Sequence, residues 1–303
     1  MLSSVSRSVR RAVAYAAALA VVVALVIATR SALPDAADRT ADTAAQRAGA
    51  ADGAGQPPQR FPLFGRRTNG HLVDYEQNGA GGLKTGVDMG GGFGDMTALL
   101  QANVSANGAG NDLYYRMNGS LYFTAERDND TQLIGPGWDM FTLLVSVGNM
   151  GGTADPDLVA RDAGGALWLY QGQGGGKLES RIKIGNAGWN AMDRLVGRGD
   201  YTGDGKADLI SRGTDGTLYL YPGTGKAVEG GTLGSRFIVG KGWDAYVLFA
   251  STGDSDGDGR TDLIASDKAG ALWLFKGTGN ASAPFAPRVQ IGTAGWGGFD
   301  AIF

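Results

Sequence analysis

The feature of this sequence that most constrains its fold is an internal repeat. A Gly-x-Leu step that enters an aromatic stretch occurs five times, at Gly70, Gly119, Gly165, Gly216 and Gly270. A glycine followed by an aromatic residue also occurs five times and in step with it, at Phe93, Trp138, Trp189, Trp243 and Trp296. Two markers that recur together indicate five copies of one structural unit, and such a repeat decides the architecture before local propensity does.

Each unit contains four short runs with strand composition and no sustained apolar period of 3.6. Examples are DLVARD at Asp157, DLISRG at Asp208 and DLIASD at Asp262. The 52 glycines fit short strands joined by tight turns, and the 6 Trp, 10 Tyr and 11 Phe argue for a packed core rather than disorder. Four short strands per unit match one blade of a β-propeller. We therefore predict an all-β fold over residues 61–303, a five-bladed β-propeller of four-stranded antiparallel blades with almost no helix.

The phase of the repeat predicts how the ring closes. The domain begins at FPLFGRR, which corresponds to the second strand of the unit, and it ends at FDAIF, which corresponds to the first. The C-terminal strand, residues 299–303, should therefore pair with residues 62–66 and complete the first blade, which removes an exposed sheet edge. An open stack of repeats or a β-solenoid is the alternative.

Two loops concentrate oxygen-bearing side chains. GDSDGDGRTDL, from Gly253, places carboxylates at Asp254, Asp256, Asp258 and Asp262. GDYTGDGKADL, from Gly199, places oxygen donors at the same offsets, at Asp200, Thr202, Asp204 and Asp208. Carboxylates this close repel one another unless a cation lies among them, and alternating oxygen donors in a glycine-turned loop suit Ca²⁺. The alternative is an ordinary turn, because Asp and Gly are common turn formers.

The unit D-x-D/T-x-D-G-x-x-D-L, followed by a short apolar strand, resembles the FG-GAP/VCBS repeats of secreted and cell-surface propellers, including integrin α-subunit heads. The phrases ALWLYQGQG, LYLYPGTG and ALWLFKGTG look like the actinobacterial version. The resemblance covers residues 61–303 and implies that the acidic loop joins the first two strands of a blade and binds a structural Ca²⁺. It implies two such sites, with main-chain carbonyl ligands from Arg260 and Lys206 beside the side chains named above. The corresponding loops near Asn103 and Asn149 depart from the pattern, and we expect no ion there.

The N-terminal segment 1–36 is predicted to be a signal peptide or a membrane anchor. Three arginines precede an uncharged, mostly apolar run from Ala12 to Thr29, which is typical of a secretory signal peptide and just long enough for a membrane anchor. Residues 37–60 are rich in Ala, Gly, Asp and Gln, and we expect a disordered linker. Both interpretations predict a propeller that is secreted or held at the extracellular face of the membrane.

Charge and composition exclude several functions. The whole chain carries −3; the first 36 residues carry +3, which leaves −6 for the rest, so we expect no nucleic-acid partner. The absence of Cys excludes disulfides and thiolate metal sites. His71 is the only histidine, which excludes multi-histidine zinc sites, and it occupies a position filled by Ser, Ala or Thr in the other units. No catalytic motif is present, so we predict no enzyme, although paired carboxylates of a glycoside hydrolase stay open.

The tryptophans have two interpretations. Those at 138, 189, 243 and 296 recur at one place in the unit, as core residues between blades would, and Trp168 and Trp273 alternate with leucines in strands that we expect to be buried. The alternative is a platform for sugar rings, although the variable loops 126–132 and 226–234 are better ligand candidates. We predict a monomeric calcium-binding module for a glycan or cell-wall polymer. The alternatives are an extracellular polysaccharide hydrolase and a surface scaffold for protein–protein interaction.

Overall fold

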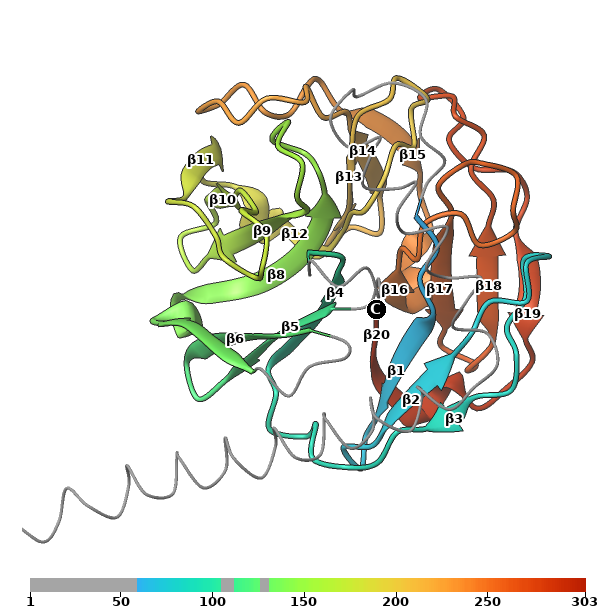
Figure 1. The fold of residues 1–303 in the computed structure, drawn as a ribbon. Helices are drawn as coiled ribbons and strands as arrows, with labels where there is room; N and C mark the ends of the chain where they lie inside the picture. The colour runs from blue at the N-terminus through green and yellow to red at the C-terminus, as the bar shows by residue number, and fades with distance from the viewer. Residues whose placement is uncertain (1–58, 105–111, 126–130) are drawn as a thin grey trace, which may run out of the picture.

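The computed structural model describes residues 59–104, 112–125 and 131–303. Five four-stranded antiparallel sheets stand in a ring around a central axis, which confirms the predicted five-bladed propeller (Figure 1). The helical structure in these residues consists of four short 3₁₀ turns, and none of it is long and apolar enough to cross a membrane. The predicted signal or anchor and almost all of the predicted linker lie outside the described residues.

The strands run from the axis outward in each blade. Blade 1 contains β20 (Phe299–Ile302), β1 (Leu63–Arg67), β2 (Leu72–Tyr75) and β3 (Val87–Asp88). Blade 2 contains β4 (Ala98–Ala102), β5 (Asp112–Met117), β6 (Ser120–Thr124) and β7 (Gln132–Pro136). Blade 3 contains β8 (Phe141–Gly148), β9 (Asp157–Asp162), β10 (Leu167–Tyr170) and β11 (Ile182–Gly185). Blade 4 contains β12 (Met192–Val196), β13 (Leu209–Gly213), β14 (Leu218–Tyr221) and β15 (Phe237–Gly240). Blade 5 contains β16 (Tyr246–Ala250), β17 (Leu263–Asp267), β18 (Leu272–Phe275) and β19 (Val289–Gly292).

The ring closes through the C-terminal strand, as predicted. β20 pairs antiparallel with β1, with Gly65 opposite Ile302 and Arg66 opposite Ala301. Phe64 and Phe303 exchange two main-chain hydrogen bonds, at 2.9 and 3.0 Å. The first blade therefore consists of both ends of the domain, so unfolding either end opens the ring.

The hydrophobic core is divided among the spaces between the blades. Five clusters of buried side chains each draw on two neighbouring blades. Between blades 2 and 3, for example, Tyr114 and Phe123 pack with Leu158, and each of the three is at most 1% exposed. The two faces of each sheet are therefore covered by the adjacent blades, which is why these strands read as nearly continuous apolar runs.

Four of the tryptophans begin the 3₁₀ turns η1 (Trp138–Met140), η2 (Trp189–Ala191), η3 (Trp243–Ala245) and η4 (Trp296–Gly298), which lead into the next blade. Each ring packs on an aromatic ring of that blade's third strand, with centroids 4.6–4.8 Å apart, in the pairs Trp138–Tyr170, Trp189–Tyr221, Trp243–Phe275 and Trp296–Tyr75. Trp189 is half-buried and the other three are buried. The prediction that this repeated position is scaffold is therefore confirmed.

The prediction that Trp168 and Trp273 are core residues was wrong in part. Both are half-buried, and they pack against the clusters between blades 2 and 3 and between blades 4 and 5 without being enclosed by them. Arg181 lies over the Trp168 ring at 4.3 Å and Arg288 lies over the Trp273 ring at 4.0 Å. A guanidinium therefore covers the face of each ring that the core does not.

Each of four neighbouring blade pairs is joined by an arginine on the second strand, which we call an arginine latch. Its Nη1 donates to two carbonyl oxygens, that of the aromatic residue that leads into the next blade and that of the residue three positions later. The four latches are Arg66, Arg116, Arg161 and Arg212. A charged donor on two carbonyls is worth more than a neutral hydrogen bond, so the latches tie the sheets together where main-chain pairing stops.

Blade 5 lacks a latch because Ser266 occupies the arginine position. Ser266 is fully buried, and its hydroxyl has no hydrogen-bond partner among the described residues. The junction between blades 5 and 1 contains instead the hydrogen bond from Phe61 N to the Thr252 carbonyl at 2.9 Å, the Arg60–Asp254 ion pair at 3.0 Å and the Trp296–Tyr75 contact.

We predict that replacing a latch weakens the whole ring. Arg161→Met removes the two carbonyl contacts, and leaves both carbonyls without this donor, so we expect a loss of about 2–3 kcal/mol in the free energy of unfolding. Urea unfolding measures it. Lys268→Met, on an exposed side chain, is the control and should change stability by less than about 0.5 kcal/mol. Equal effects of the two substitutions would contradict the role of the latch.

Candidate functional site

The two acidic loops connect the first and second strands of blades 4 and 5. Residues 199–208 join β12 to β13, and residues 253–262 join β16 to β17. Gly203 and Gly257 turn the two loops at φ +81° and +89°, a conformation that side chains rarely adopt. The placement is the one that the resemblance implies.

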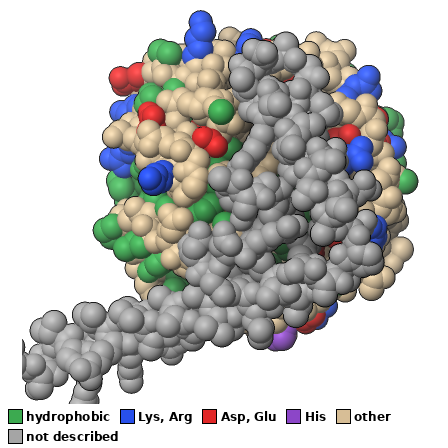
Figure 2. All heavy atoms as spheres, in the orientation of Figure 1, with side chains coloured by type: hydrophobic (Ala, Val, Ile, Leu, Met, Phe, Trp, Pro, Cys, Tyr) green, Lys and Arg blue, Asp and Glu red, His purple; other side chains and the backbone are tan. Residues whose placement is uncertain are grey.

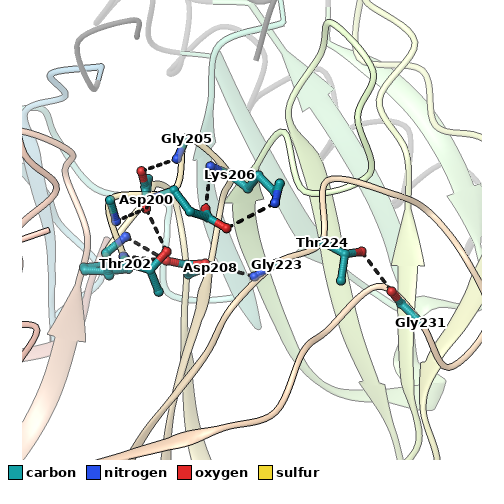
Figure 3. A network of polar contacts seen from close by, with 11 residues as sticks. Asp200, Thr202, Gly205, Lys206, Asp208, Gly223, Thr224 and Gly231 are labelled. Atoms are coloured by element: carbon teal, nitrogen blue, oxygen red, sulfur yellow. Dashed lines mark hydrogen bonds and ion pairs between the residues drawn. The ribbon is translucent and has the colours of Figure 1, made fainter. Parts of the chain in front are cut away.

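In the blade 4 loop the main chain wraps around two carboxylates (Figure 3). Asp200 accepts hydrogen bonds from the N–H groups of Gly203 at 2.6 Å and Gly205 at 2.7 Å, and the Thr202 hydroxyl donates to it at 3.1 Å. Asp208 is buried and accepts from the N–H of Thr202 at 2.9 Å. Carboxylate oxygens of Asp200, Asp204 and Asp208 lie within 4.8 Å of one another. This loop therefore gathers three of its predicted ligands, with Thr202 beside them.

The blade 5 loop gathers a different trio. Carboxylate oxygens of Asp254, Asp256 and Asp262 lie within 4.8 Å of one another. Asp258 lies outside this trio, and its carboxylate is 3.5 Å from the Arg260 guanidinium. Lys206 and Arg260, predicted to contribute carbonyl oxygens, contact Asp204 and Asp258 through their N–H groups, at 3.0 and 2.9 Å.

Crowding and burial make these carboxylates hard to ionise together. Burial raises the pKa of Asp208 to about 6, and the charge of Asp200 adds to the effect. Burial, with the charges of Asp256 and Asp258, raises the pKa of Asp262 to about 7. A cation among the oxygens would reverse this effect, and oxygen donors at this spacing fit a hard ion such as Ca²⁺.

Two basic side chains from outside the blade 5 loop contact its carboxylates. The Arg60 Nη2 donates to Asp254 at 3.0 Å, and the Lys276 Nζ lies 2.8 Å from Asp256. The chain enters the propeller against this loop, since Asp254 N donates to the Gln59 carbonyl at 3.2 Å. A Cβ at Gly253 would lie 1.5 Å from that carbonyl oxygen, so only glycine permits the approach. The repeat pattern did not reveal these contacts, because Arg60 precedes the first unit.

The two departing loops are closed by hydrogen bonds. In blade 3, Asp157 accepts from the N–H groups of Met150, Gly151 and Gly172 at 2.9, 2.6 and 3.0 Å. Asn149 accepts from Gly152 N at 2.8 Å. In blade 2, Asp112 accepts from Val104 N at 2.7 Å, and the rest of that loop lies outside the described residues.

His71 forms a surface pair with Asp88, at 3.0 Å, and its side chain is 41% exposed. A turn or strand role fits this position.

Blades 3, 4 and 5 carry a repeated arrangement at their outer surface, which we call the rim pairs. In each, an exposed arginine lies over a half-buried aromatic ring of the third strand, at 4.3, 4.3 and 4.0 Å, in the pairs Arg181–Trp168, Arg236–Tyr219 and Arg288–Trp273. The indole N–H groups of Trp168 and Trp273 donate to Asp162 and Asp267 at 2.8 and 2.7 Å. In Figure 2 the Lys and Arg side chains on the described part of the face are scattered among acidic and neutral ones.

Three solved structures are similar to this chain at low identity. The BP39L lectin from Burkholderia pseudomallei is 13% identical, with 79% of this chain and 72% of that chain covered and a TM-score of 0.42. The WD40 domain of SCAP from fission yeast is 8% identical, with 79% and 58% covered and a TM-score of 0.34. BBS1N, solved with ARL6DN, is 12% identical, with 79% and 84% covered and a TM-score of 0.37. These values carry no inference about ligands.

No curated protein matches the chain. A family model described as the FG-GAP-like repeat matches residues 200–265, which run from the first aspartate of the blade 4 loop to the strand after the blade 5 loop. Residues 200–265 of this five-bladed propeller are therefore similar to the FG-GAP-like repeat.

Proposed function

We propose that this protein is an extracellular binding module in which two structural calcium ions hold the loops of blades 4 and 5 and the rim pairs bind a glycan or cell-wall polymer. The rim pairs are the observation that carries the proposal, because they present the same chemistry three times in successive blades. A polymer with repeated units gains affinity from repeated sites.

The chemistry of a rim pair suits a hydroxyl-rich ligand. The exposed edge of the ring offers an apolar surface, and the guanidinium above it presents several N–H donors to hydroxyl or carboxylate oxygens. Next to the blade 3 pair, Lys183 lies 5.3 Å from the Trp168 ring, and its carbonyl accepts from Gly230 N at 3.1 Å. Gly230 belongs to the variable loop 226–234, so this loop borders the blade 3 pair and would help to select the ligand.

Calcium has a supporting role in this proposal. Asp200, Asp204 and Asp208 would hold one ion, and Asp254, Asp256 and Asp262 would hold the other. The ions would neutralise crowded carboxylates and fix the connection between the first two strands of each blade. They lie in loops rather than at the rim pairs, so we expect them to stabilise the fold without touching the polymer.

We predict that removing calcium lowers the melting temperature of the full chain. An extracellular-type site has a Kd of ~10⁻⁴ M, so ~1 mM calcium adds roughly 1.4 kcal/mol per site, or about 3–6 °C. Differential scanning calorimetry with 1 mM Ca²⁺ and with chelator measures the shift. Asp204→Asn should remove about half of it. An unchanged melting temperature would count against both sites.

We predict that Arg60 weakens calcium binding in the blade 5 loop, because its guanidinium competes for Asp254. The Arg60 side chain is 45% exposed, so the ion pair is modest, and Arg60→Gln should tighten binding about two- to fivefold. Calorimetric titration in an Asp204→Asn background isolates this loop. Lys268→Gln in the same background is the control. Weaker binding in Arg60→Gln would show that Arg60 supports the site instead.

We predict that the full chain is retained on one or more insoluble cell-wall or plant polysaccharides without releasing soluble product. Trp273→Ala should reduce retention at least fivefold, because it removes the ring beneath Arg288. Ile238→Ala, on a 68% exposed side chain of β15, is the matched control and should bind as the native chain does. Melting temperatures of both variants confirm that the fold persists.

A protein partner is the second candidate, and the outer strands favour it. They expose large apolar side chains at Val87, Leu133, Ile238 and Val289, between 46% and 68%. Retention on none of the polysaccharides would favour a protein partner at this surface. Release of soluble sugar by the native chain would support the hydrolase.

A further inference from the structure

A single charged side chain crosses the propeller axis. Arg198 follows β12 in blade 4, and its Nη2 donates to the carbonyl oxygen of Gln101 on β4 in blade 2. These blades are not neighbours in the ring, since blade 3 lies between them (Figure 1). The guanidinium also lies 4.0 Å from the centroid of the Phe61 ring, which begins blade 1. Arg198 therefore reaches three blades across the centre of the ring.

Arg198 departs from the repeat. The equivalent position, just before the glycine that opens the loop, is Val147 in blade 3 and Thr252 in blade 5. Arg198 also has a φ of +92°, one of two positive values among the described residues that are not glycine. Such a conformation costs energy and persists where the surroundings impose it, often at functional sites. The scaffold of the other blades does without this residue.

The charge of Arg198 has no counter-charge in the described part of the chain. Arg198 is only 9% exposed, and its Nη1 has no hydrogen-bond partner among the described residues. No carboxylate of residues 59–104, 112–125 or 131–303 forms an ion pair with it. An ionised group buried without an opposite charge is strongly unfavourable. A negatively charged acceptor at Nη1 would therefore satisfy the donor and balance the charge together.

The neighbouring polar side chains do not supply the acceptor. The Gln101 amide nitrogen donates to the carbonyl oxygens of Pro62 and Phe303, at 2.9 and 2.7 Å. Tyr201 donates its hydroxyl hydrogen to Ser251 Oγ at 2.7 Å. These bonds fix the walls around the guanidinium and leave two polar atoms without a partner among the described residues, the donor Nη1 of Arg198 and the acceptor Oε1 of Gln101.

We infer that a small inorganic anion, of the size of a halide, binds on the propeller axis at Nη1 of Arg198. The anion would complete the hydrogen bonding of the guanidinium and neutralise its charge. It would join blades 1, 2 and 4 through one residue near the axis, whereas the rim pairs lie at the outer surface. The inference does not depend on the proposed polymer binding or on calcium.

The test uses bromide as the probe, with the full chain in 1 mM Ca²⁺ at constant ionic strength. Replacing gluconate, which is too large for a buried position, by bromide should raise the melting temperature along a saturable curve by about 2–4 °C. Constant ionic strength removes the screening contribution. Crystals soaked in bromide should show an anomalous peak within hydrogen-bonding distance of Nη1.

Matched variants locate the effect. Arg198→Met should abolish the bromide-dependent rise, whereas Arg236→Met, which removes an exposed rim arginine, should keep it. If Arg198→Met does not fold, the soaked crystal of the native chain decides. A water bridging Nη1 and Gln101 Oε1 in place of the peak, or a rise that does not saturate, would overturn the inference.

Discussion

The ring depends on guanidinium groups that connect sheets where the strand ladders stop. Within a blade, every strand is hydrogen-bonded to its neighbour, but between blades the main-chain hydrogen bonds are isolated ones, such as Gly175 N to the Val104 carbonyl at 3.0 Å and Gly230 N to the Lys183 carbonyl at 3.1 Å. The latch arginines supply directed bonds at those junctions, because each binds two carbonyls of the turn that starts the next blade. The aromatic pair beside each turn supplies the buried area. The latches therefore add directed, charge-assisted hydrogen bonds to the apolar contacts between blades.

The latches and the acidic loops both place charged groups inside the protein, but the latches place cations and the loops place anions. A latch places a cation on carbonyl dipoles, and two of the four latches, Arg66 and Arg212, also pair with a carboxylate, that of Asp300 and that of Asp193. An acidic loop places several carboxylates together, and their negative charge must be neutralised by nearby cations. In blade 5 the protein meets part of it with Arg60 and Lys276, whereas in blade 4 the only such contact in the described residues is between Lys206 and Asp204, at 3.2 Å. Two loops with nearly the same residues therefore present different fields to an incoming ion.

Much of the fold followed from the sequence because repetition is a local signal that reports on global structure. The number of blades, the strand phase and the closure by residues 299–303 all follow from markers spaced along the chain. The two acidic loops could be located for the same reason. The latches also had a signal, since an arginine recurs in GRR, YRM, ARD and SRG, but its partners are main-chain carbonyls, which leave no mark in a sequence. Trp168 and Trp273 were misplaced because alternation with leucine shows that a strand has two faces without showing which face a guanidinium covers.

What no repeat could reveal is contact between positions that occur once. Arg60 precedes the first unit and reaches a loop 194 residues later, and Arg198 reaches Gln101 across 97 residues and past an intervening blade. Periodicity predicts what is the same in every blade, which is the scaffold. Arg198 has an unfavourable main-chain conformation and a buried charge, and both features destabilise the fold. Blades 3 and 5 have neither feature at the equivalent position. Residues that break the pattern at a cost are therefore the places to look for individual chemistry in a propeller, and the axis is where one such residue meets three blades.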